Sequence, residues 1–550
     1  MIDSKGTQSQ RQRYNKIPAK QTNGKDEAMS STCPLIRIAL IVLGLIALTM
    51  PFASSAGLKA GFSERDITPE VPDTWVDVDD NAQFDPDVDT WVDGNGNGEF
   101  DPVWMAGFQN NRPAQGVELP LKAIAMVLDD GKHRIGIVAA DTIGLMRSFA
   151  QDLRANVPDE LALDYVMVHA THNHEGPDTQ GLWGEGALSS GINDDYMRFL
   201  RDEMISALAE AVTALEPATL HMAEFPNPPQ TPVRDARKPI VVDDAVRVLA
   251  LRSLEGALLG TVVNFGIHVE LAWDRNLLLT SDVAGYLRDG ISGGITYDGA
   301  IKKPGIGGTT LWLTGNIGGL MTSAPGEWVE DPFSGERITD AGHGKARAFG
   351  YGLASAVIDQ WNEQLFTEET NPSIEILSRE VEFGITNWML ALATITGVVD
   401  SSPSFHLSRP FIRYTSEVAW LKLGQATITG IPGELYPEIA VGGIENPHGA
   451  DYALDPVEVP PLREAMSGEV NLMVNLANDA IGYIIPKSEW DNEAPWIYGA
   501  TEETYGEIVS LGEETGPTLH RQLLNLFQHN HAHSHRTKRA SEQPEEEKSE

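Results

Sequence analysis

The sequence predicts a mixed α/β (α+β) protein, built as one large domain with mixed sheets. Short runs of aliphatic and β-branched residues alternate with amphipathic helical patterns along most of the chain. The candidate metal-binding residues described below are spread from His172 to Tyr483, and a single domain is the simplest way to bring them together. Hydrophobic residues make up 41% of the 550 residues, which is enough for a large core.

The expected elements follow one another along a domain at 57–527. Apolar, β-rich runs predict strands at 123–128, 135–140, 165–168, 246–251, 261–268 and 425–430. Helical periodicity predicts helices at 194–215 and 343–364, and an amphipathic stretch follows at 518–527. Residues 528–550 contain alternating histidines, then basic and acidic residues, with almost no apolar side chains. This tail is therefore expected to be disordered.

Residues 1–56 have the pattern of a signal peptide with a long polar N-terminal region. The apolar stretch from Ile38 to Met50 precedes small residues that end at Ala56 and suit cleavage. This stretch is short for a membrane span of about 20 residues, and an uncleaved anchor is the alternative. Removing residues 1–56 also removes Cys33, the single cysteine, so that no disulfide can form. The sequence predicts a secreted, periplasmic or cell-envelope protein.

The chain is strongly acidic, with 79 Asp and Glu against 40 Lys and Arg and a formal net charge of −39. Such a surface repels phosphate backbones and excludes nucleic acid as a partner. It is compatible with a small-molecule or lipid substrate and leaves peripheral membrane contact open. The oligomeric state does not follow from the sequence.

A cluster of histidines closes one of the predicted strands. In the run Val168-His-Ala-Thr-His-Asn-His-Glu-Gly-Pro177, three imidazoles and a carboxylate precede a turn. If the segment is extended, its period of two places His172 and His174 on one side. Neutral imidazole is the usual nitrogen ligand of zinc, and a strand end leaves room for a substrate. The run predicts half of a metal site, with plain strand-end histidines as the alternative.

Three later segments present groups that can complete such a site. The apolar run from Thr261 ends in His268, and the turn Ile431-Pro-Gly-Glu434 presents a carboxylate. The segment Asn478-Asp-Ala-Ile-Gly-Tyr483 delivers a tyrosine after a glycine that permits close backbone approach. The remaining ligands are therefore sought in these segments.

With these segments the sequence resembles the neutral, non-lysosomal ceramidase family of zinc amidases. The resemblance lies in six landmarks in order along most of the chain: Asp66-Ile-Thr-Pro69, Ala170-Thr-His-Asn-His174, Asn264-Phe-Gly-Ile-His268, Pro432-Gly-Glu434, Ile481-Gly-Tyr483 and Tyr505-Gly-Glu507. It implies the catalytic domain of the family. The immunoglobulin-like domain that follows it in the family is expected to be absent, since little besides the tail follows the stretch at 518–527.

The resemblance also implies roles for individual residues. It makes His172, His268, Glu434 and Tyr483 the zinc ligands, although Tyr483 has a structural role as its alternative. His174 is expected beside the metal, in contact with the substrate or supporting the ligands, and Tyr505 is expected to donate a hydrogen bond to the oxyanion. Zinc lowers the pKa of its bound water to about 7 and polarises the carbonyl under attack.

One departure from the family concerns its Gly-Asp-x-Ser-Pro-Asn segment, which contains a serine implicated as the nucleophile. The counterpart here is Leu313-Thr-Gly-Asn-Ile-Gly-Gly-Leu320, with Gly318 at the position of the serine. Thr322 and Ser323 lie several positions further on, so attack by zinc-activated water is the simpler mechanism. The N–H groups of Gly318 and Gly319 are candidates for contact with a substrate oxygen, with a plain tight loop as the alternative.

An acidic segment at 73–104 contains a 16-residue duplication. Each copy has oxygen side chains at positions 1, 3, 5 and 9 of an EF-hand-like calcium loop: Asp77, Asp79, Asn81 and Asp85, then Asp93, Asn95, Asn97 and Asp101. Neither copy has the Glu of position 12, so either the affinity is modest or Asp87 and Asp89 compensate. The duplication predicts Ca²⁺ binding in addition to Zn²⁺, with an acidic hairpin as the alternative.

The sequence thus predicts an exported zinc-dependent hydrolase that cleaves an amide bond of an N-acyl, sphingolipid-like substrate by means of zinc-activated water. A zinc hydrolase of another ester or amide on the same fold is the first alternative. A non-catalytic calcium-dependent surface protein is the second, and the set of four zinc ligands argues against it.

Overall fold

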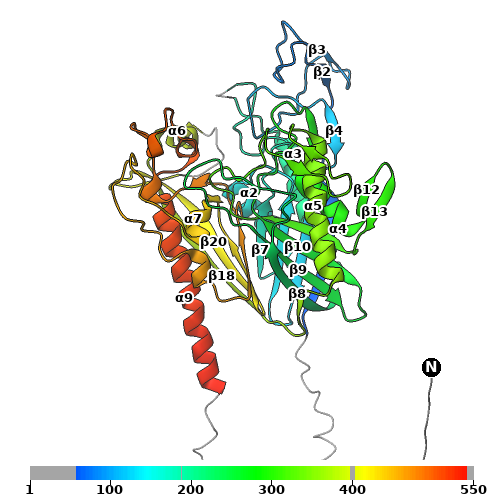
Figure 1. Ribbon diagram of the computed structural model, residues 1–550, viewed down its shortest axis with the longest axis vertical. Coiled ribbons are helices and arrows are strands. Elements are labelled where there is room, and N and C mark those ends of the chain that lie inside the picture. Colours follow the sequence, from blue (N-terminus) through cyan, green and yellow to red (C-terminus); the bar gives the residue numbers. More distant parts are fainter. Residues whose placement is uncertain (1–56, 187–188, 397–402, 542–550) are drawn as a thin grey trace, which may run out of the picture. The chain divides into compact units, whose positions relative to one another are not determined.

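Two β-sheets face each other at the centre of the fold, and helices cover the outer face of each sheet (Figure 1). The computed structural model describes residues 57–186, 189–396 and 403–541. The predicted signal peptide or anchor, at 1–56, lies outside these residues. The predicted mixed α/β class with mixed sheets is confirmed.

The larger sheet has nine strands. Most neighbours are antiparallel, but β10 pairs with β14, and β6 with β7, in parallel. The strand order is β14 (Thr309–Thr314), β10 (Leu258–Phe265), β9 (Ala245–Ser253), β8 (Glu216–Pro226), β1 (Lys59–Asp66), β5 (Lys122–Asp129), β6 (Arg134–Ala140) and β7 (Tyr165–Ala170), and β17 (Thr367–Glu369) also pairs with β8.

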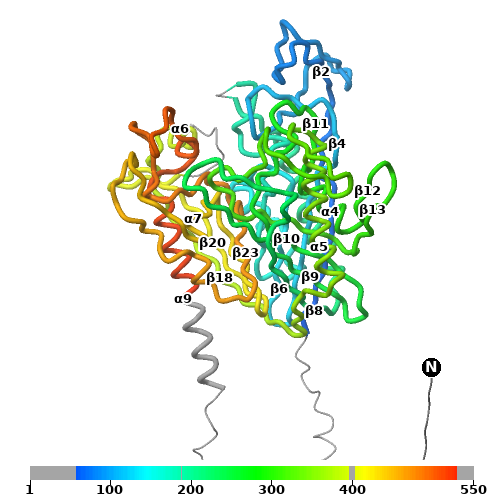
Figure 2. The backbone as a smooth tube through the Cα atoms, in the orientation of Figure 1, coloured from blue at the N-terminus to red at the C-terminus, as the bar shows by residue number. Residues whose placement is uncertain are grey.

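The smaller sheet has five strands and is also mixed. Its order is β18 (Ile374–Ile385), β20 (Ile412–Leu423), β21 (Ala426–Gly430) and β23 (Val470–Val474), and β19 (Ser404–Phe405) also pairs with β20. The pairing of β21 with β23 is parallel. Figure 2 shows these strands, from the last third of the chain, beside strands from its first half.

The period of two along each strand explains how both faces of a sheet are covered. On β5, Met126 and Leu128 belong to the core between the two sheets, whereas Ala125 and Val127 belong to the core under the helices. Strands buried on both faces read as nearly continuous apolar runs, and this is how the sequence pattern located them.

The helices form three groups around the sheets. Those on the β5 to β7 part of the larger sheet are α2 (Arg147–Asn156) and α3 (Asp194–Thr213), and those on its β9, β10 and β14 part are α4 (Asp282–Ser292) and α5 (His343–Asn362). The smaller sheet is covered by α7 (Pro437–Val441), α8 (Leu462–Ala465) and α9 (Thr515–Ser541). Helix α6 (Trp388–Thr396) follows β18.

The long helices agree with the predicted ranges, except at the C-terminal end. Helix α3 begins where Asn193 accepts hydrogen bonds from the N–H groups of Asp195 and Tyr196. Helix α9 continues to Ser541, whereas the sequence predicted disorder from Gln528. The packed turns up to Phe527 supply a nucleus from which a helix propagates at little cost per residue. Residues 542–550 lie outside the described part of the chain.

Short elements connect these layers. The strand pairs are β2 (Thr74–Val76) with β3 (Thr90–Val92), β4 (Gly116–Leu119) with β11 (Leu278–Thr280), β12 (Gly294–Tyr297) with β13 (Ala300–Pro304), β15 (Val329–Glu330) with β16 (Arg337–Ile338), and β22 (Glu434–Leu435) with β24 (Tyr483–Ile484). The 3₁₀ turns are η1 (Asp159–Leu161), η2 (Lys487–Glu489), η3 (Ile497–Gly499) and η4 (Glu507–Val509). Within the described residues, the helices lack the combination of length and apolar character that a membrane span requires.

Candidate metal centre

The four predicted zinc ligands lie together in the structure, although they come from segments far apart in the sequence. The Oε2 atom of Glu434 is 3.5 Å from Nε2 of His172 and 3.3 Å from Nε2 of His268. The hydroxyl of Tyr483 is 3.4 Å from Nε2 of His268. All four side chains are buried.

Backbone pairing between distant segments places three of these four side chains. Glu434 on β22 is paired in register with Tyr483 on β24. Gly482 permits this arrangement, because a Cβ at that position would lie 1.8 Å from the carbonyl oxygen of Val509. His268 follows β10, and its N–H donates to the carbonyl of Met321. Main-chain pairing therefore fixes the positions of Glu434, Tyr483 and His268.

His172 and His174 converge for a different reason from the one that the sequence suggested. The argument from periodicity assumed an extended segment, but β7 ends at Ala170 and His172 has a φ of +63°. Hydrogen bonds from the N–H of Asn173 to Thr142 and from the N–H of His174 to Val269 hold this turn. The Nε2 atoms of the two histidines are 3.1 Å apart.

The third imidazole of the segment, His169, lies outside the centre. It is fully buried, and its Nε2 accepts a hydrogen bond from the N–H of Thr314. For this histidine the structural interpretation is the correct one.

The hydrogen bonds of the ligands leave metal-binding atoms available. Nδ1 of His172 is 2.8 Å from the carbonyl oxygen of Ile143, and Nδ1 of His268 is 3.0 Å from that of Met321. A carbonyl can only accept, so both Nδ1 atoms donate and both Nε2 lone pairs face the centre. Oε2 of Glu434 is buried and makes no hydrogen bond of standard geometry to a described residue. These donors fit a zinc ion.

The local electrostatics favour a bound cation. Burial lowers the pKa of His172 to about 4, and burial together with His172 and His268 holds the pKa of His174 well below its ordinary value. Burial alone would raise the pKa of Glu434, but His172 and His268 outweigh it and hold that pKa below its usual range. The pKa of His268 moves the other way, because burial, which would lower it, is outweighed by the hydrogen bond to Glu434 and the charges of Glu270 and Glu434, which raise it. A neutral His172 beside a charged Glu434 suits metal binding, and a cation at this point would compete with the proton on His268.

Glu270 belongs to the centre and was missed by the sequence argument. Its Oε2 atom is 3.3 Å from Nδ1 of His174, on the side of the ring away from His172. Both side chains are buried. Its signal in the sequence is a carboxylate two residues after His268, in the short run that follows the apolar strand β10.

Tyr505 stands at the rim of the centre. Its ring is 5.8 Å from that of Tyr483, and the residue is half exposed. Burial of its hydroxyl and the nearby carboxylates of Glu434 and Glu270 raise its pKa to about 12. At neutral pH this hydroxyl keeps its proton and remains a hydrogen-bond donor.

Gly318 has no room for a side chain, and its N–H group is occupied. A Cβ there would lie 2.4 Å from Cδ2 and 2.5 Å from the backbone nitrogen of Tyr436. Its N–H donates to the carbonyl of Leu435, so it does not face a substrate. The interpretation as a tight loop is therefore correct for Gly318. Thr322 and Ser323 are both buried in the adjoining loop.

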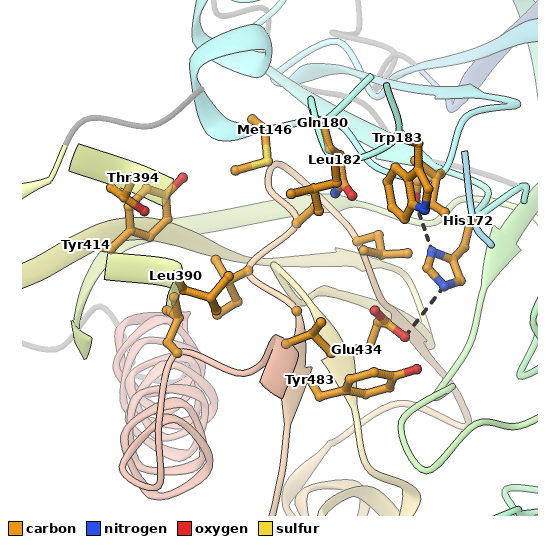
Figure 3. Close-up of a pocket in the computed structure, with 18 of the residues that line it drawn as sticks. Met146, His172, Gln180, Leu182, Trp183, Leu390, Thr394, Tyr414, Glu434 and Tyr483 are labelled. Carbon is orange, nitrogen blue, oxygen red and sulfur yellow. Dashed lines mark hydrogen bonds and ion pairs between the residues drawn. The ribbon is translucent and has the colours of Figure 1, made fainter. Parts of the chain in front are cut away.

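A mostly apolar cavity of about 150 Å³ extends from the centre. His172, His174, Glu434 and Tyr483 line one end, and Figure 3 shows Leu390 and Thr394 of α6 at the opposite end. The apolar lining between and around them is Ile143, Met146, Leu182, Trp183, Ile385, Leu476, Ile481, Val509 and Leu511. Such a cavity can hold one apolar chain next to a reacting group at the centre.

The duplicated acidic segment forms the β2–β3 hairpin with one loop after each strand. Three carboxylates, from Asp77, Asp79 and Asp89, offer oxygens within 4.8 Å of one another. Asp89, which the sequence offered with Asp87 as a compensating ligand, belongs to this group. Asp85 is not part of it, and its Oδ1 accepts a hydrogen bond from the N–H of Asp87.

In the second loop, too, an aspartate from the other copy accepts a hydrogen bond from the loop backbone. Oδ1 of Asp73 accepts from the N–H of Gly94, just as Oδ1 of Asp89 accepts from Val78 in the first loop. Asp93 accepts hydrogen bonds from three backbone N–H groups of its own loop, and the amides of Asn95 and Asn97 donate to Asp101. Each copy therefore lends its first aspartate to the loop of the other.

Comparison with known proteins gives a result for the fold alone. No protein-family model and no curated protein matches this sequence. The crystal structure of neutral ceramidase from Pseudomonas aeruginosa matches with a TM-score of 0.58 and 16% identity, over 86% of this chain and 74% of that chain. A structure described as ceramidase complexed with C2 matches with the same TM-score and 14% identity, over 86% of this chain and 75% of that chain. The resemblance seen in the six sequence landmarks is thus confirmed at the level of structure, and the chain has the fold of the neutral ceramidases.

Proposed function

We propose that this protein is a zinc-dependent hydrolase that cleaves the amide bond of an N-acyl, sphingolipid-like substrate. The observation that carries the proposal is the convergence of His172, His268, Glu434 and Tyr483 beside an apolar cavity. A metal centre at the end of an apolar chain site suits a substrate with a polar scissile bond and a hydrocarbon tail.

The residues around the centre have complementary roles in this reaction. Zinc, when bound, supplies an activated water and polarises the scissile carbonyl. Oε2 of Glu270 lies 3.3 Å from Nδ1 of His174 and favours the orientation in which the other ring nitrogen faces His172, where it can contact the substrate or accept a proton. Tyr505 donates a hydrogen bond to the developing oxyanion from the rim. The apolar lining excludes water from the acyl chain.

The absence of the family serine supports one alternative substrate class. Gly318 packs against Tyr436 and leaves no space for a serine hydroxyl, so the chemistry here depends on activated water. An activated water attacks esters as well as amides, and a zinc hydrolase of another ester or amide is the alternative that this residue favours.

A panel of substrates distinguishes these proposals. The protein should be loaded with zinc and offered N-acylated sphingoid bases, N-acyl amino acids and acyl esters of the same chain length. We expect release of fatty acid and amine from the N-acyl sphingoid bases, and loss of this release when zinc is removed with a chelator. Preferential cleavage of the esters would select the alternative. No cleavage of any compound by the zinc-loaded protein would refute a hydrolase.

We further propose export, on the strength of the signal-like pattern at 1–56, and Ca²⁺ binding by the acidic hairpin. Bound Ca²⁺ would offset the repulsion among the crowded carboxylates and would stabilise the folded state by mass action. The packing of Trp75 against Phe84, and of Phe84 against Phe100, then couples the two loops.

Removal of Ca²⁺ should loosen the hairpin without emptying the zinc centre. In calcium-free buffer we expect a lower melting temperature and faster proteolysis between Asp73 and Asp101, both reversed by millimolar calcium. Asp93→Ala combined with Asp101→Ala should reproduce the loss, whereas the exposed pair Glu255→Ala with Glu363→Ala should not. If calorimetry detects no heat of binding and the melting curve does not move, the segment is only an acidic hairpin.

A further inference from the structure

Helix α6 exposes large apolar side chains in a way that a water-facing helix ordinarily does not. Trp388, Met389, Leu392 and Ile395 are between 44% and 72% exposed. Their spacing places them on one face of the helix, because residues three, four and seven apart line the same side. A contiguous apolar patch of this kind marks a contact site for a protein or a membrane.

Further exposed apolar side chains lie on the hairpin of β19 and β20, where Ile412 pairs with Phe405 on one side and, on the other, with Ile385 at the end of β18, three residues before α6. Phe405 on β19 is 69% exposed, Leu407 is fully exposed, and Phe411 is 52% exposed. Figure 1 shows α6 beyond the upper ends of β18 and β20, at the edge of the smaller sheet. We define the α6 surface as Trp388, Met389, Leu392, Ile395, Phe405, Leu407 and Phe411.

The opposite face of the same helix lines the cavity of the candidate metal centre. Leu390 and Thr394 belong to the cavity wall, whereas Trp388 and Ile395 face outward. Figure 3 shows Leu390 and Thr394 at the end of the cavity away from His172. The exposed apolar surface and the apolar interior are thus separated by the width of one helix.

The charge around this surface selects the kind of partner. From Thr386 to Arg413 the sequence has one carboxylate, Asp400, where about four would be expected from 79 acidic residues in 550. Glu382, just before this stretch, is paired with Arg413 and His406. The segment that carries the patch is therefore poor in carboxylates in its sequence.

Acidic groups instead border the patch on the side of Trp388. The depression that contains Trp388 and Met389 is also lined by Asp451, Glu493, Glu503 and Glu513. Carboxylates at this position repel anionic phospholipids and attract the ammonium groups of choline lipids. Aromatic side chains such as Trp388 are suited to the boundary between headgroups and acyl chains.

We propose that the α6 surface docks on a zwitterionic lipid surface and brings the cavity next to the membrane. The docking proposal depends on the proposed function only for the purpose of docking, which is to deliver an apolar substrate to the cavity. Docking itself follows from the exposed apolar side chains and the surrounding charge, and it does not require hydrolysis.

Flotation with phosphatidylcholine vesicles in calcium-free buffer tests docking directly. The full protein should float with these vesicles and should bind phosphatidylserine vesicles more weakly at low salt. Trp388→Ser combined with Phe405→Ser should weaken vesicle binding at least tenfold, with an unchanged melting temperature because both side chains are exposed. The matched control, Ile240→Ser with Leu254→Ser, removes equally exposed apolar side chains elsewhere and should bind like the parent protein.

Other results would overturn the proposal. Equal vesicle binding by parent and the Trp388 and Phe405 variant would remove the α6 surface from docking, and tighter binding to phosphatidylserine would contradict the charge argument. Self-association in sedimentation velocity that the same variant abolishes, without vesicle binding, would make this surface a protein interface. If vesicle binding follows the prediction but no N-acyl substrate is cleaved in the panel, the docking surface stands and the proposed hydrolase fails.

Discussion

Replacing His172 with Asn is expected to empty the metal centre and to lower hydrolysis about a thousandfold or more, which corresponds to roughly 4 kcal/mol of transition-state stabilisation. The Nε2 atom of His172 faces Glu434, whereas its Nδ1 atom is occupied by the carbonyl of Ile143. Asn is the appropriate replacement because residue 172 has a φ of +63°, and Asn tolerates this left-handed conformation better than Ala. The Asn variant therefore tests loss of the metal without the backbone strain that Ala would add at this position.

Three measurements decide this prediction. The zinc content per chain should fall from about one to near zero, the rate should fall with it, and the melting temperature of the chelated variant should match that of the chelated parent. His221→Asn is the matched control, since His221 is also buried but lies on β8 with Thr219 as its partner. A variant that keeps its zinc and its activity would remove His172 from the ligand set.

Introducing the serine of the ceramidase family at position 318 is expected to destabilise this protein by roughly 3 kcal/mol or more and to abolish hydrolysis. The reason is steric. A Cβ at this position meets the ring and backbone of Tyr436 at 2.4 and 2.5 Å and the carbonyl carbon of Leu435 at 2.7 Å. Relief of these contacts must displace β22, which carries Glu434 into the centre.

Chemical denaturation and zinc analysis of Gly318→Ser measure both effects. Gly318→Ala should behave alike, since the clash begins at Cβ and not at the hydroxyl. Gly344→Ser, in α5, is the control because nothing lies within 4 Å of its added Cβ. Normal stability together with a gain of activity in Gly318→Ser would mean that the loop can accept the nucleophile of the family, contrary to the structure.

The strands and long helices could be predicted from the sequence because their information is local. Apolar runs such as 123–128 and 135–140 are strands buried on both faces, and the pattern at 343–364 matches a helix at His343–Asn362. The candidate ligands could be named because each stands at the end of such an element, in an order that resembles one family. Chemistry and order along the chain were therefore accessible without a structure.

Only the tertiary structure decided which of these groups meet. It separated His169 from His172, placed Glu434 opposite Tyr483 through the β22–β24 pairing, and brought Glu270 to His174. In the acidic hairpin it gathered Asp77 and Asp79 with Asp89. The physical reason is that hydrogen-bond register between distant segments, and left-handed turns such as the one at His172, leave no periodic trace in the sequence.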